Sequence, residues 1–426
     1  MTADPIDVLH ALPRYAGRAD EGYKPGLDRM QALLDALKVD VGALPTIHVA
    51  GTNGKGSTAA MIAAIAQAAG YTVGLHTSPH LWSVTERMRI NGAPISEATL
   101  REDILRAQAA FERIQPSFFE ATVALSLQHF ARHSVDLAVV EVGLGGRLDA
   151  TNVVQSQVAV ITSIGLDHTA LLGDTHAAIA REKGGIMRAG RPVVVGPLPA
   201  EAQEALTTQA RGLGAPFYPT PTGTRWREAP STGRTLITPR GCYSVEALDF
   251  PGTHQQANAA CAVRALELHP HLTISSEAVT RGLQGTRAYT GLHGRMEQIA
   301  THPPIWVDVA HNAEGLAAAC ATLPRCPGRC IVALGMMRDK PLAPLLDVLA
   351  TTPMCTLWPV SLATERAHPG PSVQQAAANR GWQVAPPRTL SDHIREYEAT
   401  ASPEDMLFVT GSHYTVAAVP PHVRPG

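Results

Sequence analysis

The chain has 426 residues, which is enough for two or three domains and too many for one small domain. Hydrophobic residues make up 45% and charged residues 17%, which is typical of a globular protein and excludes a disordered one. The formal net charge of −2 at pH 7 lacks the basic excess that nucleic-acid-binding and membrane-surface proteins carry. We therefore expect neither a nucleic-acid nor a membrane partner.

All six cysteines lie from Cys242 onward, and a disulfide framework is not expected in a chain of this length. A reducing, cytoplasmic location is the expectation. The N-terminal residues, MTADPIDVLHALPRY, have no signal-peptide pattern. The most apolar window, residues 59–75, is interrupted by Gln67 and Gly70, so it indicates a buried helix running into a strand and not a membrane span.

Strand-like runs alternate with helical patterns through the first half of the chain. Helices are predicted at residues 57–69, 97–114 and 120–133, between short runs rich in β-branched residues at 46–51, 72–77, 136–143, 158–165 and 191–196. This alternation is typical of a mostly parallel sheet with both faces covered by helices. Residues 197–250 are poorer in such runs and rich in Pro, Thr and Gly, so an irregular or short-stranded insert is expected there.

A second alternating set follows a Gly-rich stretch at residues 285–295, where we expect the linker. Its strand-like runs are at residues 304–311, 330–337, 355–361 and 406–412. The predicted fold is therefore α/β with two domains. Residues 1–293 are expected to form a P-loop-type, mostly parallel sheet domain, and residues 294–426 a smaller, Rossmann-like α/β domain.

The segment TIHVAGTNGKGSTAAM combines a strand, a Gly-rich turn and the start of a helix. Glycines let the turn direct backbone N–H groups toward phosphate, and the helix N-terminus adds its dipole. Lys55 can reach the terminal phosphates and Ser57 can cap the helix near a metal, although Gly56 separates them, unlike in the common phosphate-loop pattern. The segment predicts ATP binding by Thr52, Asn53, Gly54, Lys55, Gly56 and Ser57.

Polar side chains follow three of the predicted strands. Ser78 follows one of them, Glu141 ends a very apolar one, and His168 comes shortly after a third. In parallel sheets, ligands collect at the carboxyl ends of the strands. Mg²⁺ is a hard cation that takes a few protein ligands and bridges to substrate phosphates. The alternative is that these are unrelated capping and core polar residues.

The segment GTNGKGS resembles the phosphate loop of the Mur ligase superfamily. The motifs after it resemble the folylpolyglutamate synthase/dihydrofolate synthase family, in its bacterial bifunctional type. The motifs occur in the family's order over nearly the whole chain: TSPHLWSVTERMRINGAPIS (77–96), VVEVGLGGRLDATNVV (139–154), TSIGLDHTALLGDT (162–175), REKGGIM (181–187), DVAHNAEG (308–315), GMMRDK (335–340) and TGSHYTVAAV (410–419).

The resemblance implies that Ser78, Glu141 and His168 bind Mg²⁺, one or two ions in all. It also implies a role for Lys183, one of only five lysines among 35 basic residues. A lysine amine can lose its proton and add CO₂ to become a carbamate, whereas a guanidinium effectively cannot. A carbamylated Lys183 would support a second Mg²⁺ and the phosphates. The alternative is an ordinary helix lysine paired with Glu182, and Gly184, where the family usually has alanine, is expected to loosen that helix.

In the second half of the chain the resemblance makes Asn258, Arg295 and Asp308 nucleotide contacts and places His311, as a catalytic residue, near the phosphates. Lys340 falls in the family's loop near the active cleft. The alternative for His311 is a histidine at the end of a strand that makes its hydrogen bonds within the protein. For Lys340, a role in the active cleft and an ordinary lysine are equally favoured.

The resemblance also implies a site for the flat pteroate group. Aromatic residues beside a carboxylate suit a heterocycle with hydrogen-bonding edges. The start of a core helix explains Phe118 and Phe119 almost as well. The residues implied are Ser117, Phe118, Phe119, Glu120, Leu148, Asp149 and Ala150.

The sequence therefore predicts an ATP-dependent ligase that joins L-glutamate to dihydropteroate, to folyl-(poly)glutamate or to both, through an acyl phosphate. A monomer is expected. One alternative is a Mur-type ligase acting on a cell-wall precursor, disfavoured because only about 50 residues precede the phosphate loop. The other is a nucleotide-binding module without catalysis, disfavoured by the presence of Lys55, Glu141, His168 and Lys183.

Overall fold

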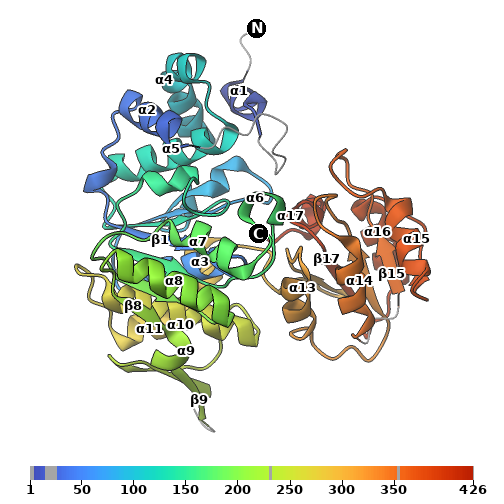
Figure 1. Ribbon diagram of the computed structural model, residues 1–426. Helices are drawn as coiled ribbons and strands as arrows, with labels where there is room; N and C mark the ends of the chain where they lie inside the picture. Colours follow the sequence, from blue (N-terminus) through green and yellow to red (C-terminus); the bar gives the residue numbers. More distant parts are fainter. Residues whose placement is uncertain (1–3, 15–25, 230–232, 353–355, 426) are drawn as a thin grey trace. The chain divides into compact units, whose positions relative to one another are not determined.

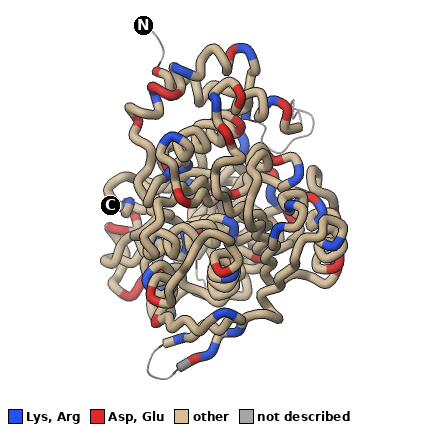
Figure 2. The backbone as a smooth tube through the Cα atoms, turned by 90° about the vertical axis from the view of Figure 1, so that its left-hand side faces the viewer, with Lys and Arg blue, Asp and Glu red and all other residues tan. Residues whose placement is uncertain are grey.

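The computed structural model describes residues 4–14, 26–229, 233–352 and 356–425 (Figure 1). It divides into two compact units. Unit 1 comprises Met1–Asp249 with His254–Leu292, and unit 2 comprises Phe250–Thr253 with His293–Gly426. Figure 2 shows acidic and basic residues interspersed along the described backbone, in keeping with the small net charge.

Unit 1 is built on an eight-stranded sheet in the order β4-β3-β2-β5-β1-β6-β7-β8. All pairs from β2 to β8 are parallel, and only β3 and β4 at one edge are antiparallel. This confirms the predicted fold class. The strands are β1 (Thr46–Ala50), β2 (Val73–His76), β3 (Met88–Ile90), β4 (Ala93–Pro94), β5 (Leu137–Glu141), β6 (Val158–Ile161), β7 (Val193–Val195) and β8 (Phe217–Pro219).

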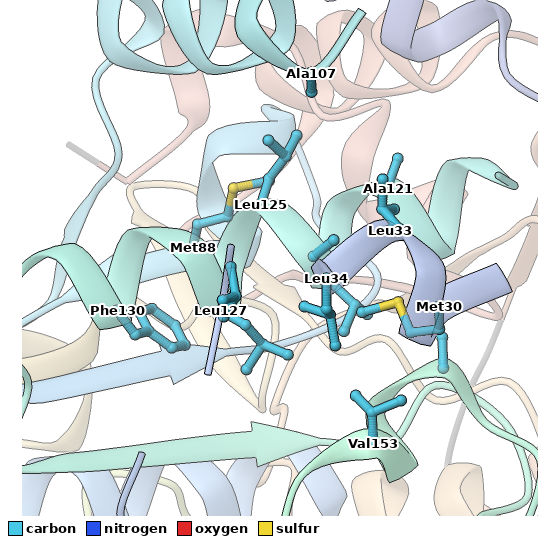
Figure 3. Close-up of a cluster of buried hydrophobic side chains, with 14 of the residues drawn as sticks. Met30, Leu33, Leu34, Met88, Ala107, Ala121, Leu125, Leu127, Phe130 and Val153 are labelled. Carbon is cyan, nitrogen blue, oxygen red and sulfur yellow. The ribbon is translucent and has the colours of Figure 1, made fainter. Parts of the chain in front are cut away.

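Helices cover this sheet, and its central strands β1, β5 and β6 are buried along their whole length. Helix α3 (Lys55–Ala68) is buried at nearly every position and packs on α11 (Ser276–Gln284) and α12 (Thr286–Thr290). Another core forms where α2 (Asp28–Ala36), α4 (Glu97–Ile114) and α5 (Phe118–Arg132) meet (Figure 3). In Figure 3 Leu33 and Leu34 of α2 lie near Ala121 of α5.

The expectation of an irregular insert at residues 197–250 is wrong for its first part. Residues Ala200–Gly212 form helix α8, whose apolar Ala202, Leu206 and Ala210 recur every four residues and form its buried face. Alanine and polar residues dominate the rest of α8, so its pattern is weak in the sequence. The short strands expected after it are present as an antiparallel sheet of β9 (Arg225–Ala229), β10 (Gly233–Ile237) and β11 (Cys242–Val245), preceded by α9 (Thr220–Gly223).

Unit 2 has a six-stranded sheet in the order β12-β13-β17-β14-β15-β16, in which only β12 is antiparallel. Its strands are β12 (Glu297–Thr301), β13 (Pro304–Val307), β14 (Cys330–Leu334), β15 (Thr356–Pro359), β16 (Gln383–Val384) and β17 (Met406–Thr410). The helices are α13 (Ala313–Cys320), α14 (Leu342–Ala350), α15 (Gly370–Ala378), α16 (Leu390–Thr400) and α17 (His413–Ala417).

Unit 1 contains four further α-helices among the described residues. They are α1 (Pro5–Ala11), α6 (Thr169–Leu172), α7 (His176–Gly184) and α10 (Thr253–Leu268), with the short 3-10 helices η1 (Val41–Ala43), η2 (Val84–Arg87) and η3 (Ala150–Val153). Unit 2 ends with η4 (Pro421–Val423). Among the described helices, none is long and apolar enough to cross a membrane.

Candidate active site

The turn between β1 and α3 requires glycine at two positions. Gly51 has φ +154° and a Cβ there would lie 1.9 Å from Thr162 Oγ1. Gly54 has φ +84° and a Cβ there would lie 2.3 Å from Asn258 Oδ1. Both the backbone conformation and the lack of space therefore exclude a side chain. The turn ends at the N-terminus of α3, where first-turn N–H groups have no partner within the helix and can bind phosphate.

The segment after β6 holds this turn in place. Thr52 N donates to the carbonyl of Ser163 (2.9 Å), and Asn53 N donates to Ser163 Oγ (3.0 Å). Thr162 Oγ1 donates in return to the Asn53 carbonyl (2.6 Å). The phosphate loop is therefore ordered by the protein itself, and binding phosphate does not require the loop to be ordered first.

Two of the five lysines meet at this loop. Lys55 Nζ donates to the carbonyls of Gly51 and Thr52, both at 3.1 Å. Lys183 Nζ, from α7, donates to the same Gly51 carbonyl at 2.9 Å, and Lys183 is only 4% exposed. We name residues 51–57 together with Lys183 the phosphate side of unit 1.

Close packing holds α7 in position. Thr175 caps its first turn, and Glu182 forms an ion pair with Arg147 (2.9 Å). A Cβ at Gly184 would lie 2.1 Å from Gln209 Oε1 of α8, the helix beside α7 in Figure 1. Gly184 leaves room here for the end of the Gln209 side chain, and the expectation that it loosens α7 stays a prediction.

Two of the expected metal ligands lie in contact. Glu141 ends β5, is 4% exposed, and its Oε2 accepts a hydrogen bond from Ser78 N (2.9 Å), just after the neighbouring strand β2. A buried carboxylate is costly without compensating charge, so this position suits a cation.

His168 follows β6, which ends at the same edge of the sheet. It has φ +51°, unusual for a residue other than glycine, and its N donates to Asp167 Oδ1 (2.8 Å). No group of three His, Cys, Asp or Glu side chains that could hold a metal occurs among the described residues. The expected ligands Ser78, Glu141 and His168 do not count as such a group, because serine is not among those four residue types. Their oxygen and imidazole donors fit a divalent cation.

Helix α10 brings two amide side chains to the phosphate loop. Asn258 Nδ2 donates to Gln255 Oε1 (2.8 Å), and Gln255 Nε2 lies 3.4 Å from Ser57 Oγ. The sequence analysis named Asn258 but missed Gln255. The only signal for Gln255 was a polar residue on the buried face of α10, three positions before Asn258.

In unit 2 the expected residues lie after the carboxyl ends of β13 and β14 or close to β12. Asp308 is buried and accepts from Met296 N and Ala310 N, both at 2.8 Å. Burial raises the pKa of Asp308, and the charge of Arg295 opposes this rise. His311 Nδ1 lies 3.0 Å from the Val309 carbonyl. Lys340, which follows β14, is 8% exposed.

The residues expected to bind pteroate take part in the packing of unit 1. Ser117 and Glu120 form a capping box at the start of α5, and Glu120 pairs with Arg29 (3.0 Å). Asp149 caps η3, and burial raises its pKa while hydrogen bonds from Thr151 and backbone N–H groups oppose the rise. These contacts agree with the alternative of a core helix start without excluding a ligand.

Sequence reasoning missed the cationic and imidazole side chains around Phe118. The guanidinium carbons of Arg14 and Arg87 lie 4.5 and 5.2 Å from its ring centroid, and His10 stacks on it at 5.7 Å. Arg87 Nε donates to His80 Nδ1 (2.8 Å), and burial with the neighbouring cations lowers the pKa of His80 to about 3. We name this cluster, together with Ser117–Glu120 and Leu148–Ala150, the acceptor side of unit 1.

Family models match most of both units. Residues 49–266 match the Mur ligase middle domain, and residues 294–413 match the Mur ligase glutamate ligase domain. The dihydrofolate synthase/folylpolyglutamate synthase of Bacillus subtilis is 34% identical over 95% of this chain and 96% of its own length.

Solved structures agree over nearly the full chain. An Escherichia coli FolC in complex with DHPP and ADP has a TM-score of 0.87 at 30% identity, covering 98% of this chain and 97% of that one. A bifunctional folylpolyglutamate synthase/dihydrofolate synthase with Mn, AMPPNP and L-glutamate bound has a TM-score of 0.84 at 32% identity, covering 97% and 96%. The chain belongs to the dihydrofolate synthase/folylpolyglutamate synthase family of the Mur ligase superfamily.

Proposed function

We propose that this protein is an ATP-dependent ligase that adds L-glutamate to dihydropteroate, to folyl-(poly)glutamate or to both. ATP phosphorylates the acceptor carboxylate, the amino group of glutamate attacks the acyl phosphate, and phosphate leaves as the amide bond forms. The observation that carries the proposal is the convergence of Lys55 and Lys183 on the Gly51 carbonyl of the phosphate loop. Members of the same family with matching folds bind ADP, AMPPNP and L-glutamate.

Catalysis here consists mainly of positioning anions and neutralising their charge. The N-terminus of α3 and Lys55 supply positive potential to the phosphates. Ser78, Glu141 and His168 would hold Mg²⁺, which when bound neutralises phosphate charge. We assign Asn258, Arg295 and Asp308 to the nucleotide and His311 to the neighbourhood of the phosphates.

We further propose that Lys183 carries a carbamate. The neutral amine forms an N–C bond with CO₂ and releases one proton, so a cation becomes an anion with two oxygens. The product keeps one N–H, which suffices for the hydrogen bond to the Gly51 carbonyl. If Lys183 and Lys55 are both ammonium groups at the Gly51 carbonyl, they repel each other. A negatively charged carbamate on Lys183 would instead attract the Lys55 ammonium group.

We assign the acceptor to the residues Ser117, Phe118, Phe119, Glu120, Leu148, Asp149 and Ala150. The cations around Phe118 suit an acceptor that carries carboxylates in addition to a flat ring. A cell-wall precursor as substrate is not supported by the comparisons, whose curated relatives are named for folate substrates.

The test is phosphate release from ATP with Mg²⁺ and L-glutamate, with dihydropteroate or a folyl-monoglutamate as acceptor. We expect release to require glutamate and at least one acceptor, with one glutamate residue added to the product by mass spectrometry. Release that is independent of both acceptors would contradict the proposal. Comparing the two acceptors distinguishes dihydrofolate synthase from folylpolyglutamate synthase activity.

We also propose a cytoplasmic monomer. The buried thiol of Cys261, which forms no disulfide in the structure, is compatible with a reducing compartment. Cell fractionation tests the location. Light scattering behind size-exclusion chromatography tests the oligomeric state, and a mass near twice 45.1 kDa would contradict the monomer.

A further inference from the structure

The short helix η3 joins segments of unit 1 that are far apart in the chain. We name Asp149, Thr151 and Asn152 the η3 clamp. Their side chains are buried, with residue exposures of 6%, 0% and 8%. The clamp connects β1, the loop 143–149 and the end of α7. The chemistry proposed above gives no role to Thr151 or Asn152.

One half of the clamp ties the loop to the central sheet. His48, on β1, has its Nε2 2.9 Å from Thr151 Oγ1. Thr151 donates to Asp149 Oδ1 from both its N (3.0 Å) and its hydroxyl. Asp149 Oδ2 accepts from Leu144 N (2.8 Å), near the start of the loop. Since β1 lies between β5 and β6, this chain of hydrogen bonds fixes the loop to the centre of the sheet.

The other half ties the loop to α7. Asn152 Nδ2 donates to the carbonyls of Arg147 and Gly185, both at 3.0 Å. Asn152 Oδ1 accepts from Arg188 Nη2 (2.8 Å). Both amide protons and the amide oxygen of Asn152 are therefore used within the chain, which is what a structural bridge requires.

Between the two halves, the loop packs directly on the backbone of Lys183. A Cβ at Gly146 would lie 2.8 Å from the Lys183 carbonyl and 3.0 Å from its Cα. A Cβ at Gly185 would lie 2.4 Å from Arg147 Cα. No space separates the loop from α7, so a displacement of the loop displaces Lys183.

We propose that the η3 clamp positions Lys183, so that its Nζ reaches the Gly51 carbonyl beside the phosphate loop. Thr151 and Asn152 are positioning residues and touch no substrate. The same loop ends in Leu148–Ala150 on the acceptor side, so the clamp also fixes the acceptor relative to Lys183. The role of Lys183 rests on the proposed function, whereas its position depends only on the contacts above.

The kinetic test compares Thr151→Val, which removes the hydroxyl at nearly constant size, with Thr151→Ser, which keeps it. Asn152→Asp replaces the amide donors facing two carbonyls by a carboxylate. We expect Thr151→Val and Asn152→Asp to lower kcat by about 10- to 100-fold, because displacements near 1 Å cost that much. Their Kd for AMPPNP should stay within about twofold, since the phosphate loop is held separately.

Two controls accompany these variants. Thr151→Ser should stay within about threefold of the parent kcat, because it keeps the hydroxyl. Arg106→Ala removes an exposed ion pair with Glu102 on α4, away from this loop, and should change kcat by no more than about twofold. A parent-like kcat in Thr151→Val, or a change confined to KM for dihydropteroate, would overturn the proposal.

Hydrogen exchange gives a readout that does not need the reaction. Peptides covering α7 should exchange faster in Thr151→Val than in Thr151→Ser, while peptides of α3 keep their protection. If the parent does not ligate glutamate but α7 loses protection in Thr151→Val, the proposed function fails and the clamp stands. If the parent ligates and α7 protection is unchanged, the clamp fails alone. Should Asn152→Asp not fold, the Val and Ser pair at position 151 still decides.

Discussion

The phosphate side of unit 1 takes its loop from seven consecutive residues, 51–57, whereas the acceptor side surrounds Phe118 with His10, Arg14, His80 and Arg87 from separate segments. The phosphate side contains lysines on a backbone carbonyl, and the acceptor side contains imidazole and guanidinium groups around an aromatic ring. The difference indicates that local backbone geometry forms the phosphate loop, while the cluster around Phe118 depends on how the whole unit folds.

The largest effect is expected from Lys183→Arg. Arginine keeps the positive charge but cannot carry a carbamate, so kcat should fall by at least about 100-fold, as for loss of other groups that act at the reacting phosphate. A ¹³C signal from labelled bicarbonate, present in the parent protein and absent in the variant, would identify the carbamate.

Two controls show whether the loss of kcat in Lys183→Arg is specific to this position and to catalysis. Lys38→Arg, after the end of α2, should leave kcat unchanged, and AMPPNP should still bind Lys183→Arg. A variant that ligates glutamate near the parent rate would rule out the carbamate, although the ligase could still use the phosphate side as described.

Gly54→Ala tests whether backbone geometry alone makes the phosphate side. The added Cβ would lie 2.3 Å from Asn258 Oδ1 at a φ of +84°, so the loop has to shift. We expect AMPPNP to bind at least about 10-fold more weakly, since phosphate binding relies on aligned N–H groups.

Gly70→Ala is the matched control, because Gly70 has φ +94° with nothing within 4 Å of the added Cβ. It carries the conformational strain without the clash, so it should cost about 1 kcal/mol of stability and leave AMPPNP affinity unchanged. Equal losses of affinity in both variants would mean that strain, and not the Asn258 contact, limits binding.

These two sides also differ in what the sequence could predict. The strand, glycines and lysine of residues 46–57 are consecutive, so the phosphate loop was predictable from local physics. The approach of Lys183 to Gly51 followed only from family resemblance, because 132 residues separate them. Helix α8 was missed since its apolar face consists mostly of alanine. The cluster around Phe118 leaves no pattern in the sequence, because tertiary folding alone brings its members together.

Acid should destabilise unit 1 through its buried histidines. Burial lowers the pKa values of His48 and His76 to about 3, and burial with nearby cations does the same for His80. The unfolded chain binds these protons at its ordinary pKa of 6.5, so the stability they contribute is complete above pH 6.5 and is lost as pH falls toward 3. Between pH 6.5 and 5.5 each fully buried histidine should cost about 1 kcal/mol, because the unfolded state is already half protonated at pH 6.5.

Urea unfolding at pH 7.0 and 5.5 measures this loss. His76→Gln removes one of the groups, so the variant should lose less stability on acidification than the parent. An equal loss in parent and variant would mean that His76 is not the group that titrates.

Glu120→Gln distinguishes a purely structural role of Glu120 from a role in binding the acceptor. It has the smallest expected effect. The carboxylate caps α5 through Ser117 N (2.7 Å) and pairs with Arg29, whose side chain is 24% exposed. A glutamine keeps the size but loses the charge, so unfolding should become easier by about 1 kcal/mol.

Glu97→Gln, at the start of α4, is the matched control. Its exposed side chain forms an ion pair with Arg101, so the variant should change stability by no more than about 0.5 kcal/mol. If Glu120 serves only the fold, KM for dihydropteroate stays at the parent value while stability falls. If KM for dihydropteroate rises about 10-fold at unchanged stability, the Glu120 carboxylate instead accepts hydrogen bonds from the edge of the pterin. Glu120 would then contact its ligand through a charged group, as we propose for Lys55 on the phosphate side. The two sides would differ only in whether their residues are consecutive or scattered along the chain.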